Sequence, residues 1–219
     1  MLYQEIIDKL NALSNPESIA GMRRFGIQSK KMLGVSIPNL RSLAKEIGKN
    51  HSLAIQLWNS GIHEAQILAS MIDELDLVTV KQMEDWVNDF DSWGICDQCC
   101  NNLFYKTRFA YQKAVEWSKR KEEYVKRAGF VLMAVLAVHD KRADDKTFLS
   151  FLPIIKREAD DDRNYVKKSV NWALRQIGKR NRILTRAAIE TARKIQLQNS
   201  KSARWIAADA LRELNLRKI

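Results

Sequence analysis

The sequence contains few of the residues on which several classes of protein depend. Its 219 residues include 3 cysteines, 3 prolines and 8 glycines. Three cysteines cannot all pair within the chain, so a disulfide-rich secreted fold is excluded and a reducing compartment is expected. No apolar run approaches the roughly 18 residues that a membrane-spanning helix needs. The first residues also lack the basic start and apolar core of a signal peptide. We therefore expect a cytoplasmic protein that does not bind a membrane.

The three cysteines lie together, and their spacing is compatible with metal ligands. Cys96, Cys99 and Cys100 form a C-x-x-C-C segment. A structural zinc site takes four ligands at matched spacing, and both His63 and His139 are distant in sequence. On a helix, the first and last of these cysteines lie one turn apart, which suits small buried side chains. The sequence therefore predicts packing rather than metal binding. Glycine-rich phosphate loops are absent too, and we expect no cofactor.

Apolar residues recur at intervals of three and four along almost the whole chain, which is typical of amphipathic helices. Residues that favour helix starts precede many of these segments, and no alternating strand pattern of useful length is present. The sequence predicts one all-α domain over residues 1–219 with about twelve helices. In its second half we expect helices from Asp91 or Ser92 to Tyr105 and then over 108–119, 122–138, 145–158, 163–177, 183–196 and 200–214.

A near-repeat in the last third of the chain predicts how these helices are organised. Residues 124–127 read YVKR, and residues 165–168 read YVKK, 41 positions later. Residues 172–175, WALR, are echoed 37 positions on by residues 209–212, DALR. A period of about 40 with helical content is typical of stacked antiparallel helix pairs of the HEAT or armadillo kind. We therefore expect a HEAT-like solenoid that aligns its basic repeat ends along a concave face.

The positive charge is concentrated in the second half of the chain. Residues 1–100 contain 9 Lys and Arg against 13 Asp and Glu, whereas residues 101–219 contain 28 against 13, within a total net charge of +11. Nucleic acid is the usual partner of such a basic surface. Solvated helix faces with excess Lys and Arg would be the alternative.

Four residues could form a site for chemistry on such a partner. Trp93 and Asp97 are four positions apart and share one face of a helix. Trp172 lies in the most basic repeat, and Arg127 opens a strongly apolar helix. A carboxylate weakens DNA binding unless the ligand carries compensating positive charge, as a cationic base or an oxocarbenium-like sugar does. Taken singly, each of the four could equally have a packing or solvated role.

The sequence also resembles the AlkD-type DNA alkylation repair family of HEAT-like repeat DNA glycosylases. The matching segments occur in order over nearly the whole chain: residues 33–46 (LGVSIPNLRSLAKE), 63–64 (HE), 92–97 (SWGICD), 126–128 (KRA) and 170–175 (VNWALR).

This resemblance implies an enzyme, a DNA-alkylpurine N-glycosylase. It would excise cationic bases such as 3-methyladenine and 7-methylguanine from double-stranded DNA without flipping them, unlike most base-acting enzymes. Trp93 and Trp172 would contact the deoxyribose, and Asp97 would stabilise the positive sugar. The implied DNA-binding residues are Arg127, which would hold a phosphate, with Lys126, Tyr165, Lys167, Lys168 and Arg175. We expect a monomer that associates with the bacterial nucleoid when engaged.

Gly94 departs from the family pattern, because a carboxylate often stands at this position. Gly inside a helix costs about 1 kcal/mol relative to Ala, so the local geometry is expected to differ. Two other functions stay open on the sequence. One is a HEAT protein that binds DNA by shape without excision, and the other is a protein-binding scaffold.

Overall fold

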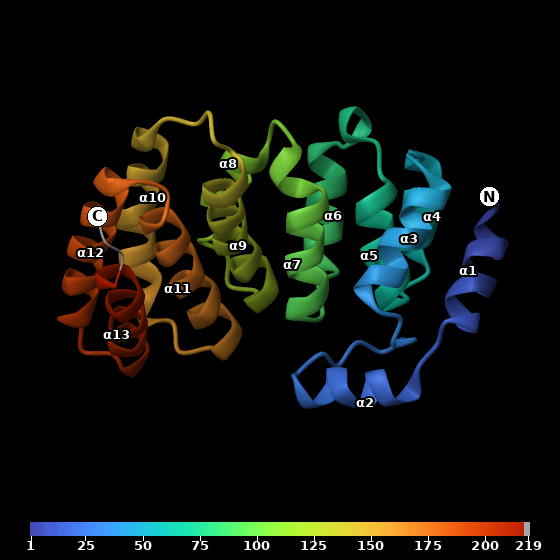
Figure 1. Ribbon diagram of the computed structural model, residues 1–219, viewed down its shortest axis with the longest axis horizontal. Coiled ribbons are helices and arrows are strands. Elements are labelled where there is room, and N and C mark those ends of the chain that lie inside the picture. Colours follow the sequence, from blue (N-terminus) through green and yellow to red (C-terminus); the bar gives the residue numbers. More distant parts are fainter. Residues whose placement is uncertain (217–219) are drawn as a thin grey trace. The chain divides into compact units, whose positions relative to one another are not determined.

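The computed structural model describes residues 1–216, and these residues are almost entirely helical (Figure 1). They form thirteen α-helices, where the sequence predicts about twelve, and three single-turn 3-10 helices. The all-α prediction is confirmed, since within this range β pairing is limited to an isolated bridge between Lys31 and Ile62. No helix of the described residues is long and apolar enough to cross a membrane.

The helices fall into two compact units, Met1–Thr107 and Arg108–Ile219. The single domain that the sequence predicts stays a prediction. The first unit contains α1 (Tyr3–Ala12), α2 (Pro16–Arg24), α3 (Ile37–Ile47), α4 (His51–Asn59), α5 (His63–Ile72), α6 (Val80–Asn88) and α7 (Trp93–Asn102). The second contains α8 (Ala110–Trp117), α9 (Glu123–His139), α10 (Asp145–Arg157), α11 (Asn164–Gly178), α12 (Arg182–Gln196) and α13 (Lys201–Asn215).

Short polar side chains set many of the helix starts. Asn15, Ser36, Thr79 and Asp144 each accept a hydrogen bond from a backbone N–H in the first turn of the helix that follows. Such caps satisfy donors that have no partner inside the helix. The start at Asp145 agrees with the helix predicted over residues 145–158. α7 differs at its other end, because it stops at Asn102 and a 3-10 turn replaces the rest of the helix predicted to reach Tyr105.

In the second unit, α9, α11 and α13 pack side by side, and α8, α10 and α12 cover them (Figure 1). α9 supplies the centre of the core, with twelve buried residues among its seventeen. Its Gly129 allows the closest approach, because a Cβ there would lie 2.4 Å from the backbone nitrogen of Ser118 at the end of α8. Helix pairs stacked in this way are the packing that the 40-residue period predicts.

In the first unit, α5 packs against α3, α4 and α7, and α2 stands apart from this core (Figure 1). The indoles of Trp58 on α4 and Trp86 on α6 stack with their ring centroids 3.9 Å apart. α2 buries none of its nine residues. Hydrogen bonds at its ends attach it to the rest of the unit, as with Asn15 N–H, which donates to the Leu33 carbonyl at 2.8 Å.

Candidate functional site

The first two turns of α7 carry two of the predicted site residues. Trp93 opens the helix and Asp97 follows one turn later, so the indole and the carboxylate share one side of α7. Both side chains are half-buried. The Trp93 Nε1–H donates to the carbonyl of Phe25, the residue that ends α2, at 2.9 Å. This contact fixes the indole orientation through a backbone group that the sequence pattern does not reveal.

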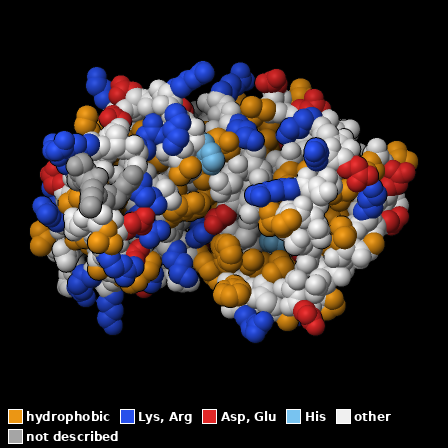
Figure 2. Space-filling view, viewed as in Figure 1, with side chains coloured by type: hydrophobic (Ala, Val, Ile, Leu, Met, Phe, Trp, Pro, Cys, Tyr) orange, Lys and Arg blue, Asp and Glu red, His pale blue; other side chains and the backbone are white. Residues whose placement is uncertain are grey.

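Gly94 is explained by what packs against it. A Cβ at this position would lie 3.0 Å from Cδ1 of Ile27 and 3.3 Å from Cε1 of His63. The glycine therefore lets a buried imidazole and an isoleucine approach the turn that bears Trp93 and Asp97. Figure 2 shows apolar side chains gathered where α2 ends and α7 begins.

The imidazole that supports this turn is itself held by hydrogen bonds. His63 is 2% exposed, and its Nδ1 lies 3.1 Å from the hydroxyl of Ser29. Ser29 in turn donates to Asp91 at 2.6 Å. Burial lowers the pKa of His63, against the opposing effects of the Glu64 and Asp91 carboxylates. A neutral imidazole packed under α7 suits a supporting role.

The segments that carry the family resemblance in this unit contact each other. The carboxylate of Glu64 is buried and accepts hydrogen bonds from the N–H groups of Leu33, at 2.9 Å, and Gly34, at 2.7 Å. Gly34 has a φ of 75° and packs against the Asn15 carbonyl, where a Cβ would come within 2.3 Å. Glu64 therefore fastens the loop that leads from α2 to α3, a role that sequence reasoning did not assign.

In the second unit, the tyrosines of the two YVK segments lie side by side. The ring centroids of Tyr124 on α9 and Tyr165 on α11 are 5.8 Å apart. Arg127 is 6% exposed, and its Nη1 donates to the Tyr165 carbonyl at 2.6 Å. Residues 124–127 and 165–168, which correspond in the sequence repeat, therefore lie next to each other where α9 packs against α11.

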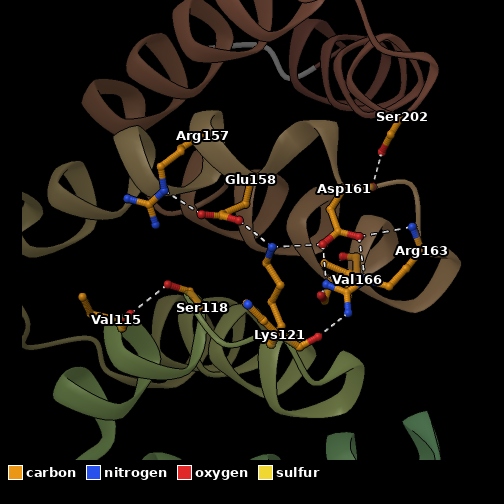
Figure 3. A network of polar contacts seen from close by, with 11 residues as sticks. Val115, Ser118, Lys121, Arg157, Glu158, Asp161, Arg163, Val166 and Ser202 are labelled. Carbon is orange, nitrogen blue, oxygen red and sulfur yellow. Dashed lines mark hydrogen bonds and ion pairs between the residues drawn. The ribbon is translucent and has the colours of Figure 1, made fainter.

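Lys126 belongs to a network of charges that the sequence did not predict, and Figure 3 shows its partners Glu158 and Asp161. Its Nζ is 2.5 Å from Glu158 and 2.9 Å from Asp161, and 11% of its side chain is exposed. Arg163 adds a further ion pair to Asp161 at 2.6 Å. A phosphate could bind Lys126 only by competing with these two carboxylates.

The pKa values of the network follow from these contacts. Burial alone would raise the pKa of Asp161, but the hydrogen bonds from Arg163 and Lys126 together outweigh it and lower the value to about 2. The pKa of Glu158 is lowered in the same way by Lys126 and Arg157. Both carboxylates are therefore charged at neutral pH and hold the start of α9 against the segment before α11.

Trp172 and Arg175 lie on α11, and each contacts a neighbouring side chain through a polar group. The side-chain amide of Gln176 is oriented with its oxygen toward Trp172. In this orientation the oxygen accepts a hydrogen bond from the indole N–H at 2.9 Å. Arg175 pairs through Nη1 with Asp209 and Glu213 of α13, each at 3.0 Å. The second pair of similar segments, residues 172–175 of α11 and 209–212 of α13, is thus also in contact.

The remaining predicted DNA-binding residues lie in the first turns of α11. Lys168 is exposed, whereas the Lys167 amino group lies 5.2 Å from the ring centroid of Trp205 on α13. The structure thus brings together Trp93 with Asp97 in one unit, and Arg127, Tyr165 and Lys167 with their neighbours in the other. A site that combines Asp97 with Trp172 and Arg127 would need residues from both units, and it stays a prediction.

The cysteines of α7 lie in the core. Cys96, Cys99 and Cys100 are all 0% exposed, as expected of side chains that pack there. Burial raises the pKa of Cys99 well above its ordinary value, and Cys96 and Asp73 act in the same direction. Within the residues described, no group of three or more His, Cys, Asp or Glu side chains is placed to hold a metal ion.

Comparisons with known proteins give similarity over nearly the whole chain. A family described as DNA alkylation repair enzyme matches residues 6–214. An uncharacterised protein from Listeria innocua is 23% identical over 197 residues, which make up 88% of this chain and 86% of that protein. A solved structure comes from a family related to the HEAT-like repeat DNA glycosylases, with affinity for branched DNA structures. It matches with a TM-score of 0.81 at 18% identity, over 97% of this chain and 95% of that chain. This likeness confirms the predicted HEAT-like fold.

Proposed function

Because the chain belongs to the DNA alkylation repair enzyme family, we propose that it is a DNA glycosylase that removes cationic N-alkylated purines from duplex DNA. Its substrates would include 3-methyladenine and 7-methylguanine, and it would act as a monomer. The observation that carries this proposal is the start of α7, where Trp93 and Asp97 lie one turn apart on a helix supported by buried side chains.

The chemistry needs one carboxylate rather than two. When the bond between C1′ and the base nitrogen breaks, its electron pair leaves with the base, which departs neutral because the alkylated base was cationic. No general acid is required, in contrast to the paired carboxylates of ordinary glycosidases. The sugar becomes positive, and Asp97 stabilises it until water adds at C1′ and loses a proton. A fixed charge aimed at a developing opposite charge is among the largest contributions to catalysis.

The other residues hold the DNA in this proposal. Indole faces attract positive charge, so Trp93 and Trp172 would contact the deoxyribose as it becomes cationic. Arg127 would bind a phosphate next to the lesion, and because it is 6% exposed it would have to turn away from the Tyr165 carbonyl to do so. Phosphate contacts of this kind fix the register of a protein on DNA without reading sequence. Excision would therefore depend on the lesion's charge, and the base need not enter a pocket.

The test is the release of 7-methylguanine from methylated duplex DNA. We expect Asp97→Asn to slow release by about 100-fold or more, as is typical when one stabilising group is removed. Trp172→Ala should slow it as well. Asp85→Asn is the matched control, because Asp85 is a surface carboxylate of the same unit that pairs with Lys81 on α6. Wild-type protein that binds this DNA and releases no base would contradict the enzymatic proposal.

A second candidate is binding to branched DNA without excision. It is favoured by the solved structure described above, whose family has affinity for branched DNA and whose fold extends over 97% of this chain. In that case the same assay gives bound DNA and no base. Binding would weaken with salt in proportion to the number of phosphates contacted.

A further inference from the structure

Trp205 on α13 exposes 42% of its surface, which is a large exposure for an indole. Single exposed apolar side chains are common, and Leu197 at the end of α12 is 87% exposed. Trp205 differs because a cation from the neighbouring helix lies over its ring, the Lys167 amino group at 5.2 Å from the centroid. An aromatic face with a lysine above it combines two groups that bind nucleic acids.

Trp205 is also the third of three aromatic side chains near the starts of α9, α11 and α13. Tyr124 and Tyr165 lie near the starts of α9 and α11 with their centroids 5.8 Å apart. Lys167 then connects the start of α11 to Trp205, the fifth residue of α13. Three neighbouring helices thus each place an aromatic side chain close to their first turn, and Trp205 is one helix beyond Tyr165.

The surface around Trp205 is basic. Lys201, one helical turn before it, and its neighbour Arg204 are both exposed, as is Lys168 on α11. The nearest carboxylate along α13, Asp209, pairs with Arg175 and is 14% exposed. Figure 2 shows Lys and Arg side chains gathered around the start of α13, with apolar side chains among them. An anionic ligand with a flat ring matches this surface in both charge and shape.

We propose that Trp205 and Lys167 form a stacking site for an unpaired nucleobase of DNA. A base within a duplex has both faces covered by its neighbours, whereas an unpaired base has a face with which to stack on the indole. The Lys167 ammonium would leave the ring face and bind the phosphate of the same nucleotide. The site therefore prefers forks, junctions and strand ends. This inference rests on the DNA-binding part of the proposed function and does not require excision.

The experiment compares a forked duplex with unpaired arms and a blunt duplex of the same length. Stacking of a base on an aromatic side chain contributes about 1–3 kcal/mol, so Trp205→Ala should lower the fork-to-duplex affinity ratio roughly 5- to 150-fold. Trp205→Phe should retain much of the preference because it keeps an aromatic face. Leu197→Ala, which removes an exposed apolar side chain elsewhere in the same unit, should leave the ratio unchanged. The fluorescence of 2-aminopurine in the unpaired arm should be quenched by the wild type and not by Trp205→Ala.

The outcomes distinguish the stacking site from the proposed excision. An unchanged ratio and unchanged quenching in Trp205→Ala would overturn the stacking site while leaving excision intact. A Trp205-dependent fork preference in a protein that releases no alkylated base would remove the glycosylase and keep the stacking site. Wild-type protein that binds neither DNA would contradict both.

Discussion

The role of Lys126 in the structure differs from the role that its sequence context suggests. In the sequence it is one of two adjacent cations at the start of a repeat, which indicates a phosphate contact. In the structure its ammonium lies between Glu158 and Asp161, which are more than 30 positions away in the chain. Sequence spacing could not predict this pairing because it depends on how the segment before α11 packs on α9.

Replacement of Lys126 by methionine should destabilise the protein at neutral pH. The two carboxylates would then lose their shared cation but keep Arg157 and Arg163, so the cost should be smaller than the roughly 3–5 kcal/mol of a buried charge left with no partner. Lys121→Met is the control, since Lys121 is exposed and a surface substitution changes stability by roughly 0.5 kcal/mol or less. Urea unfolding of the variants at pH 7 measures the difference, and equal stabilities would show that the network is energetically neutral.

The same network should make the wild type less stable in acid. The pKa of Asp161 is about 2 in the folded chain and 3.8 ordinarily, so its stabilising effect is complete above the higher value and is lost as the pH falls through the lower one. The pKa of Glu158 is lowered from 4.5 and acts in the same direction. The stability difference between wild type and Lys126→Met should therefore shrink between about pH 4.5 and pH 2. A difference that stays constant over this range would contradict the assignment.

At the scale of elements, Gly129 lets α9 pack directly against the end of α8 because it has no side chain. We expect Gly129→Ala to destabilise the protein by about 1–3 kcal/mol, because the added methyl group meets the backbone of α8 and neither helix can easily move. Gly21→Ala on α2 is a matched control, since nothing lies within 4 Å of its Cβ position and alanine favours the helix by about 1 kcal/mol. Thermal unfolding should therefore give a lower melting temperature for Gly129→Ala and no lowering for Gly21→Ala.

The sequence predicts elements well where the cause is local. Helix starts follow from caps such as Thr79 and Asp144, which act on the next three residues. The end of α7 was misplaced because Leu103 leaves the helical conformation, with φ of −126° and ψ of −61°, before a 3-10 turn. The repeat predicted that the starts of successive repeats line up, and the neighbouring rings of Tyr124 and Tyr165 show this alignment between α9 and α11.

The candidate site could be predicted only in part for the same reason. Trp93 and Asp97 share a face of α7 by their spacing alone. The Phe25 carbonyl that holds Trp93, and the imidazole of His63 beneath Gly94, come from elsewhere in the fold and leave no periodic signal. Contacts formed by tertiary packing therefore supply most of what supports the site.

At the scale of the whole molecule, the positive charge is concentrated in residues 101–219, and cations lie at the starts of α9, α11 and α13. If DNA binds along these helix starts, Lys168→Gln should reduce the slope of log affinity against log salt by about 0.9, the value for one phosphate contact. Lys141→Gln removes the same charge just beyond the other end of α9, and its slope should match the wild type. Equal slopes for the two variants would argue against this edge as the DNA-binding surface.

The hydrogen bond from Trp93 to the Phe25 carbonyl at the end of α2 affects how the proposed activity depends on temperature. α2 buries no side chain, so its opening exposes little apolar surface and requires little free energy. The indole loses its acceptor when α2 opens, whereas the cores around α5 and α9 are unaffected. We therefore expect the proposed excision to slow at a lower temperature than the one at which the rest of the chain unfolds, because this nine-residue helix opens first.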